Sequence, residues 1–425
     1  MAINFKKLAT IAFFTPVDGG WGLPLLWTGP PGVAKTALNK AWARAWNAMF
    51  LHLSPGQKGD GYFGVVPVPY RNEQGVEVLR FPVNQDIAKL MELGRGLILA
   101  DELRSAPGIV RPALLGLAQE RMFGDATLPV GVRIWAASNR TAEAVNGRAL
   151  SAPEANRFCH ISWVGADAME MMNYGVESSQ RPAFEDRIEP DYKDTAAFDA
   201  IERMVLADRA KQRGALATEI FGGFISRYDA AKASALSNQP RPNSPESDGP
   251  WPSPRSWTNV LNLHSAYRTL RANGVIQASG HESDDMELVS LIKGCVGPIG
   301  GEYLEWQREQ DIPDYAEWLD GKTPVEFEEG RDDRTFLIMA GGASHVLSLA
   351  KGSPERKRRA ASFWEHTQKL VPTAGFETVM SGAKLLMRAG QESRDLSDMS
   401  SKAGQKFMAD YRAITAQVAS GGDLS

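Results

Sequence analysis

Short apolar runs alternate with amphipathic segments along the first 165 residues of the chain. Five runs that carry few charges predict strands buried on both faces of a sheet, at 23–28, 49–54, 97–101, 132–138 and 158–164. Segments with apolar residues at helical spacing lie between them, including 36–48 and 106–120. This alternation predicts an α/β fold with a doubly wound parallel sheet of five strands.

Two hairpins are predicted to interrupt this alternation. The stretches 62–68 and 76–81 flank Asn-Glu-Gln-Gly at 72–75, which is typical of a turn. A shorter hairpin is predicted over 122–129, with Gly124 and Asp125 at its tip.

Helical patterns replace strands after residue 165. We predict helices at 198–210, 215–233, 257–272, 334–350, 354–371 and 375–389. The stretch 237–254 is rich in Pro, Ser and Asn, which predicts an exposed loop or linker. The chain therefore divides into an α/β core (1–165), a helical region (166–310) that contains this loop, and a C-terminal helical region (311–425).

Composition and charge narrow the function classes. The 425 residues include 47 Lys and Arg against 51 Asp and Glu, a formal net charge of −4, and 43% hydrophobic residues. These values exclude a collagen or a wholly disordered chain and argue against bulk electrostatic binding to nucleic acid. The basic run at 356–359 falls in a predicted helix, where a solvated helix face is expected.

Neither a membrane segment nor a disulfide framework is predicted. No apolar run approaches the ~18–20 residues that cross a bilayer. Lys6 and Lys7 precede a short apolar stretch, but no small-residue cleavage site follows it. Cys159 and Cys295 match no zinc spacing and are expected to be buried in a reducing compartment. We therefore predict a cytoplasmic protein that contacts no membrane.

The strongest candidate site is a glycine-rich stretch between a predicted strand and a predicted helix. Backbone N–H groups and the helix dipole of such a loop face phosphates. Lys35 is expected to bridge the β- and γ-phosphates of ATP, and Thr36 to hold Mg²⁺ through its hydroxyl. Ala34 stands where the usual pattern has Gly, at little cost if its backbone is helical. The predicted nucleotide-binding residues are Gly29, Pro30, Pro31, Gly32, Val33, Ala34, Lys35, Thr36 and Ala37.

Two carboxylates end the predicted strand at 97–101. In open α/β sheets ligands bind at the carboxyl ends of the strands. Asp101 is expected to join the Mg²⁺ shell, and Glu102 to act as the general base on the attacking water. Asn139 follows the next apolar run and is expected to reach the γ-phosphate or orient the attacking water, or simply to start a turn.

Together these motifs resemble the MoxR-type AAA+ ATPases of the helix-2-insert clade. The resemblance rests on GPPGVAKT at 29–36, LILADE at 97–102 and AASN at 136–139. The segment 150–158 is similar to the family's arginine-finger segment, which implies that Arg157 reaches the γ-phosphate of a neighbouring subunit, with Arg148 and Arg140 as rivals. The sequence SPRSW at 253–257 is similar to a sensor-2 helix start, which implies that Arg255 faces nucleotide, in cis or in trans.

The same resemblance implies an assembly. Residues 166–310 would form the helical lid, and the two hairpins would line a central pore of a ring, most often a hexamer. The family acts as a remodelling chaperone on protein clients, often with a von Willebrand factor A partner. Two alternatives stay open: a nucleic-acid motor, weakened because Arg71 and Arg80 are the only basic residues in 70–80, and a nucleotide-gated scaffold with little turnover.

Overall fold

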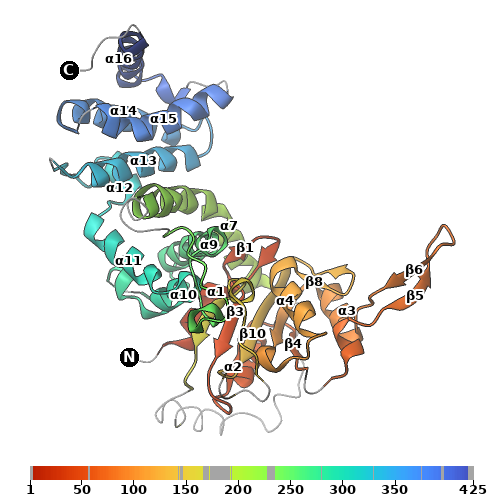
Figure 1. The fold of residues 1–425 in the computed structure, drawn as a ribbon. Helices are drawn as coiled ribbons and strands as arrows, with labels where there is room; N and C mark the ends of the chain where they lie inside the picture. The colour runs from red at the N-terminus through yellow and green to blue at the C-terminus, as the bar shows by residue number, and fades with distance from the viewer. Residues whose placement is uncertain are drawn as a thin grey trace. The chain divides into compact units, whose positions relative to one another are not determined.

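The computed structural model forms two compact units, Met1–Leu206 with Leu236–Gly301 (unit 1) and Ala207–Ala235 with Glu302–Ser425 (unit 2). Figure 1 shows the path of the chain. The structure describes residues 3–419 with these exceptions: 56–57, 142, 144–146, 166–171, 173–191, 193, 227–234, 279, 329, 375 and 394–396. The predicted helical region, 166–310, contributes residues to both units, and the three-part division of the chain stays a prediction.

Unit 1 is built on a parallel sheet of five strands in the order β11-β3-β10-β7-β4. Ser138 pairs with Thr28, and Ala100 pairs with both Ala136 and Leu53, so the carboxyl ends of the strands are aligned. This sheet, followed by helices, confirms the predicted α/β P-loop fold class. The strands are β3 (Leu25–Thr28), β4 (Phe50–Leu53), β7 (Arg95–Ala100), β10 (Gly131–Ser138) and β11 (Cys159–Ser162).

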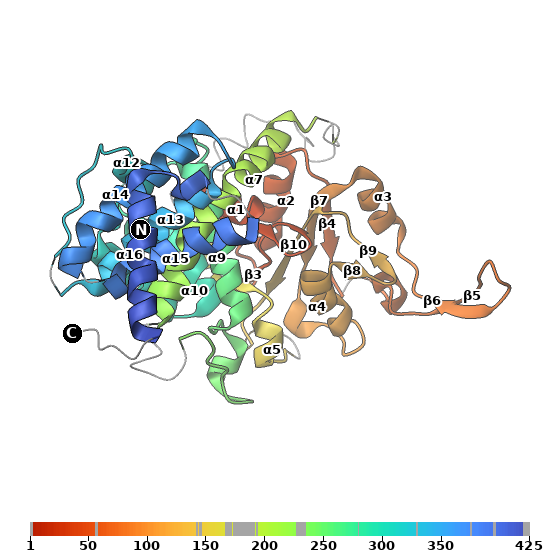
Figure 2. The same ribbon diagram turned by 90° about the horizontal axis from the view of Figure 1, so that it is seen from above.

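Helices cover the two faces of the sheet (Figure 2). Because alternate side chains of a strand point to opposite faces, Leu26 and Ile134 join one core cluster while Trp27 and Trp135 lie in an aromatic cluster on the other face. Phe13 packs against Trp135, with ring centroids 6.0 Å apart. The helices of this part are α1 (Phe5–Phe13), α2 (Lys35–Ala45), α3 (Gln85–Leu93), α4 (Arg111–Glu120), α5 (Ala152–Ala155) and the start of α7 (Ala196–Ala217), whose residues from Ala207 on belong to unit 2, with 3-10 turns η1 (Asp60–Phe63) and η2 (Leu103–Ser105).

Both predicted hairpins form, and one begins later than expected. Strands β5 (Val68–Arg71) and β6 (Glu77–Arg80) pair antiparallel, and every residue in them is exposed. They extend outward from the sheet in Figure 1. The predicted strand start at residue 62 is wrong, because Phe63 is buried in the core and belongs to η1. The shorter hairpin is β8 (Met122–Phe123) with β9 (Ala126–Thr127), and an unpredicted pair joins β1 (Pro16–Val17) to β2 (Gly20–Trp21).

The remaining helices of unit 1 follow the Pro- and Ser-rich stretch. That stretch is a loop, as predicted, but Ser247 and Ser253 in it are buried. Ser253 caps the next helix by accepting a hydrogen bond from the amide of Ser256 at 3.1 Å. Glycine at 294 lets this part pack closely on β11, since a Cβ there would lie 2.5 Å from the carbonyl oxygen of His160. The elements are η5 (Pro245–Asp248), α9 (Pro254–Ala272), η6 (Glu282–Asp284) and α10 (Met286–Val296).

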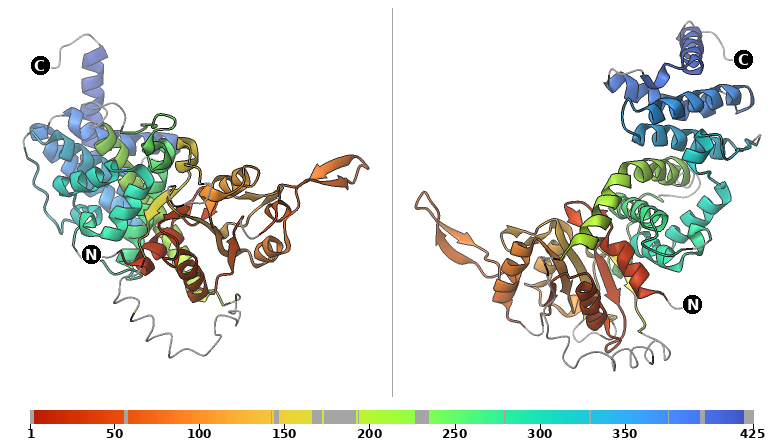
Figure 3. Two further views of the ribbon diagram at one scale, coloured as in Figure 1. Left: turned by 60° about the horizontal axis from the view of Figure 1, so that its bottom comes forward. Right: turned by 180° about the vertical axis from the view of Figure 1, so that it is seen from behind.

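Unit 2 is helical, as shown by its blue helices in Figure 3. Its elements are the π-helix η4 (Thr218–Ile225), α11 (Ile299–Gln310), α12 (Tyr315–Leu319), α13 (Asp332–Ser348), α14 (Pro354–Ala374), α15 (Phe376–Ser393), η7 (Ser397–Met399) and α16 (Lys402–Ala419). The predicted helices at 334–350, 354–371 and 375–389 are confirmed. Of the helix predicted at 215–233, residues 215–217 belong to α7 and residues 218–225 form η4. Its residues 227–233 lie outside the described part.

The basic run of α14 differs from its prediction as a solvated face. Arg356 pairs with Asp398 at 2.6 Å, and Arg359 pairs with Asp320 at 3.0 Å. Both arginines are about nine-tenths buried, whereas Arg358 is exposed.

Within the described ranges, no helix combines the length and apolar character needed to cross a membrane.

Candidate functional site

The glycine-rich loop connects β3 to α2 at the carboxyl edge of the sheet. The amide of Gly29 donates to the carbonyl oxygen of Ser138 at 3.3 Å, which anchors the loop to β10. A Cβ at Gly29 would lie only 1.8 Å from the carbonyl oxygen of Trp163, so this position accepts only glycine. Gly32 has a φ of +79°, the left-handed region that glycine enters without strain.

Ala34 does not have the helical backbone on which its expected low cost depended. Its φ and ψ are 62° and 23°, and it is the N-cap of α2, with its carbonyl accepting from the amide of Leu38. A left-handed conformation costs a non-glycine residue roughly 1–2 kcal/mol. The sequence pattern therefore carries alanine at a position whose geometry favours glycine.

The ammonium of Lys35 lies inside the loop. Its Nζ donates to the carbonyl oxygens of Gly29 and Pro30, both at 2.8 Å, and to Oδ1 of Asn139 at 3.1 Å. Burial lowers the pKa of Lys35, and the negative charges of Asp101 and Glu143 oppose part of that shift. The end of β10 thus contacts the loop at the Lys35 ammonium. A phosphate group bound here would be stabilised by that positive charge.

Thr36 and Asp101 lie in direct contact. The Thr36 hydroxyl donates to Oδ2 of Asp101 at 2.7 Å, and Nε2 of His52 lies 3.0 Å from the same oxygen. Burial alone would raise the pKa of the Asp101 carboxyl, but hydrogen bonds from His52, Thr36 and the amide of Glu102 hold that pKa below its usual value. A hydroxyl and an ionised carboxylate side by side are oxygen ligands of the kind that Mg²⁺ prefers, so these residues fit the predicted ion.

Glu102 is exposed next to Asp101. Its φ of 56° turns the chain out of β7 into η2, and its amide donates to Oδ1 of Asp101 at 2.9 Å. The Ser54 hydroxyl donates to Oε2 of Glu102 at 3.1 Å. The Glu102 carboxylate is thus oriented by a neighbouring strand and remains open to water.

Sequence reasoning missed His52 and Ser54. Both lie at the carboxyl end of β4, which neighbours β7 in the sheet. Their signal was a polar residue inside, and another at the end of, the apolar run at 49–54.

The four predicted arginines lie elsewhere. Arg157 donates from Nε to Oε1 of Gln119 on α4 at 2.7 Å. Arg255 is exposed in the first turn of α9, Arg148 is exposed, and Arg140 lies 3.8 Å from Glu143. Among the described contacts, none of these side chains hydrogen-bonds to the loop at 29–36.

The segments that carry Arg157 and Arg255 are tied together. Ser253 donates from Oγ to Oδ1 of Asn156 at 2.7 Å, and Nδ2 of Asn156 donates to the carbonyl oxygen of Trp251 at 3.0 Å. Arg157 follows Asn156 directly, and Arg255 lies two residues after Ser253. The structure therefore ties together the two chain segments that carry these arginines, next to Asn156 and Ser253.

Comparisons with known proteins find matches among solved structures. No family model matches the chain, and no curated protein matches it. A crystal structure of a "putative ATPase" from Cytophaga hutchinsonii is 19% identical, with a TM-score of 0.35 over 62% of this chain and 73% of that one. The fold assignment rests on the sheet and the loop described above.

Proposed function

We propose that the chain binds ATP with Mg²⁺ and hydrolyses it to ADP and phosphate. The observation that supports this most directly is the meeting of Lys35, Thr36, Asp101 and Asn139 at the carboxyl edge of the sheet, through hydrogen bonds of 2.7 and 3.1 Å. These four side chains come from three separate motifs in the sequence, because Lys35 and Thr36 share the glycine-rich loop. Their convergence at a glycine-rich loop is what phosphate binding requires.

In this proposal the loop amides and Lys35 hold the β- and γ-phosphates. The Thr36 hydroxyl and the Asp101 carboxylate would hold Mg²⁺, which supplies positive charge to the phosphate oxygens. The hydrogen bond from His52 helps to hold the pKa of the Asp101 carboxyl below its usual value. Asn139 contacts Lys35 and, in this proposal, reaches the γ-phosphate.

Glu102 would accept the proton of the attacking water. The water oxygen forms a bond to the γ-phosphorus, the bond from that phosphorus to the β-phosphate oxygen breaks, and ADP leaves with the electron pair. Ser54 fixes the carboxylate that takes the proton. A positioned general base contributes typically ~10²–10⁴-fold to a rate.

We further propose that the chain works as a homo-oligomeric ring, with a hexamer expected from the MoxR resemblance. Arg157 and Arg255 lie on tied segments and bond to no described residue of their own nucleotide loop, which supports supply of one or both to a neighbouring subunit. The exposed apolar side chains of the β5–β6 hairpin, such as Val68, Val78 and Leu79, support contact with a protein client. The proposed role is a MoxR-like remodelling chaperone, with a von Willebrand factor A protein as one candidate partner.

The test is Glu102→Gln, with Glu120→Gln as the matched control. Steady-state phosphate release and the Kd of a fluorescent ATP analogue are measured for each protein. We expect the Glu102 variant to lose at least about 100-fold in kcat while its Kd stays within twofold, and the control to match the wild type. Equal kcat in wild type and Glu102→Gln would refute the proposed base.

The same assays separate the two alternatives. Tight binding by a wild type that releases no phosphate would favour a nucleotide-gated scaffold. Stimulation of hydrolysis by DNA or RNA that falls steeply with salt would favour a nucleic-acid motor.

A further inference from the structure

An ion pair between buried Arg104 and partly buried Asp248 joins the loop before α9 to the turn that follows Glu102. Arg104, the middle residue of η2, is 3% exposed. Its Nε and Nη2 donate to the carboxylate of Asp248 over distances of 3.0–3.2 Å. Asp248 is the last residue of η5 and comes from the stretch that the sequence predicts to be an exposed loop. A fork of this kind fixes both position and direction of a guanidinium.

Three further segments converge on this pair. Nη1 of Arg104 donates to Oγ1 of Thr28 at 3.2 Å, directly before the glycine-rich loop. The Thr141 hydroxyl donates to Oδ2 of Asp248 at 2.8 Å, two residues after Asn139. The amide of Leu150 donates to Oδ1 at 2.8 Å, at the start of the segment that leads to Arg157. The Asp248 carboxylate therefore accepts hydrogen bonds from several of the segments that carry the sequence motifs.

The main chain of Arg104 adds to this arrangement. Its amide donates to Oγ of Ser138, the last residue of β10, at 3.2 Å. Its carbonyl oxygen accepts from the amide of Arg148 at 3.0 Å. Because Glu102 is the N-cap of the same short turn, the direction of the Glu102 side chain depends on how η2 is held.

We propose that Asp248 is a positioning residue for hydrolysis that acts through Arg104. This inference rests on the proposed ATPase function. Asp248 holds Arg104, and Arg104 holds the turn that orients Glu102. At Leu150, the Asp248 carboxylate also holds the start of the segment that leads to Arg157. A displacement of about 1 Å at a reacting group can cost ~10²-fold in rate. The loop before α9 is thus part of the hydrolytic centre without touching nucleotide.

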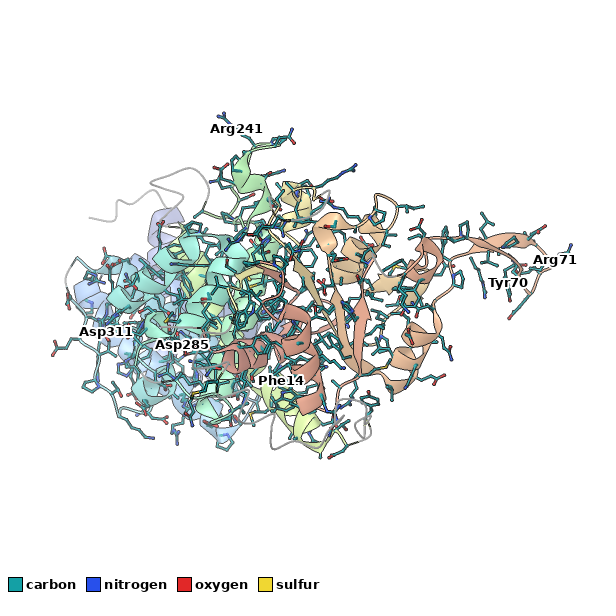
Figure 4. The ribbon with its side chains drawn as sticks, turned by 90° about the horizontal axis from the view of Figure 1, so that it is seen from below. Phe14, Tyr70, Arg71, Arg241, Asp285 and Asp311 are labelled. Atoms are coloured by element: carbon teal, nitrogen blue, oxygen red, sulfur yellow. The ribbon has the colours of Figure 1, made fainter. Side chains whose placement is uncertain are left out.

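The experiment compares Asp248→Asn and Arg104→Lys with the wild type. Asparagine keeps the shape of Asp248 but loses its charge and turns an amide group toward donors, while lysine keeps the charge of Arg104 but loses the fork. Phosphate release, the Kd of a fluorescent ADP analogue and thermal melting are measured for each. Glu246→Gln removes a carboxylate from an exposed position of the same turn and is the matched control. Arg241, which points away from the molecule in Figure 4, gives a second control as Arg241→Ala.

We expect both variants to lose at least about tenfold in kcat with Kd within twofold, and both controls to match the wild type. The double variant should be no slower than the worse single variant, because the two residues act as one unit. If Asp248→Asn fails to fold, Thr141→Val still decides: it removes one donor to Asp248, leaves the ion pair, and should lower kcat with unchanged Kd.

Three results would overturn the inference. The first is wild-type kcat in a folded Asp248→Asn protein. The second is a parallel loss of kcat and nucleotide affinity in Asp248→Asn or Arg104→Lys, which indicates a purely structural role. The third is an unfolded Asp248→Asn protein together with a Thr141→Val protein of wild-type kcat. A wild type that hydrolyses no ATP overturns the proposed function itself, whereas each of these three leaves it standing.

Discussion

Replacing Ala34 by glycine should stabilise unit 1. The left-handed backbone of Ala34 costs roughly 1–2 kcal/mol, and glycine removes most of that cost. Glycine also gives the unfolded chain more freedom, which costs about 0.4–1 kcal/mol in the opposite direction. The balance is a gain of about 0.5–1 kcal/mol in the free energy of unfolding. The side chain of Ala34 is exposed, so lost packing subtracts little from this gain.

Ala37 is the matched control, since it is also an exposed alanine and lies three residues later in the first turn of α2. Its backbone is helical, so Ala37→Gly should cost about 1 kcal/mol. Urea unfolding followed by tryptophan fluorescence gives both values from the transition of unit 1, whose aromatic cluster includes Trp27 and Trp135. The two glycine variants should shift the midpoint in opposite directions. If both shift it downward by the same amount, the left-handed assignment at Ala34 is wrong.

Two further predictions concern the same loop and its carboxylate. Gly29→Ala should abolish binding of a fluorescent ATP analogue, because its Cβ would lie 1.8 Å from the carbonyl oxygen of Trp163; binding equal to that of the wild type would show that this contact relaxes freely. His52→Ala should raise the pKa of Asp101 toward its usual 3.8. A depressed carboxylate pKa contributes stability above the unfolded value that is lost as pH falls through the folded value. The free energy of unfolding in the variant should therefore depend less on pH below about 4, measured by denaturation at a series of acid pH values.

The inner strands of the five-stranded sheet, β3, β7 and β10, were predictable because nearly all of their residues are buried. Such strands are largely apolar, so their extent is set by where apolar residues stop, and β10 ends at Ser138 as the sequence indicates. The helix α1 was not predicted, since its lysines and apolar residues resemble a targeting segment by composition alone. The ion pair of Arg356 with Asp398 was equally hidden, because local spacing carries no information about a partner on another turn.

The residues of the candidate site also fall into two groups, those that the sequence predicts and those that it does not. Lys35, Thr36 and Asp101 belong to contiguous motifs whose chemistry depends on their immediate neighbours, so their grouping could be proposed from sequence. Asp248 and His52 act through contacts between residues distant in the chain. The two cysteines illustrate this limit: neither shows spacing of interest, yet Cys295 is among the groups that raise the pKa of Cys159.

Strand order explains which residues of the proposed site would reach a phosphate and which would support them. Strand β10 lies directly beside β3, so Asn139 at its end meets Lys35 of the loop that follows β3. Strand β7 is one place further, and Asp101 at its end is reached by Thr36 because α2 brings that hydroxyl back across the edge. Strand β4 is outermost, and its end supplies side chains that touch the carboxylates. Position in the sheet thus separates the groups that would contact a phosphate in the proposed function from those that hold the carboxylates of Asp101 and Glu102 in place.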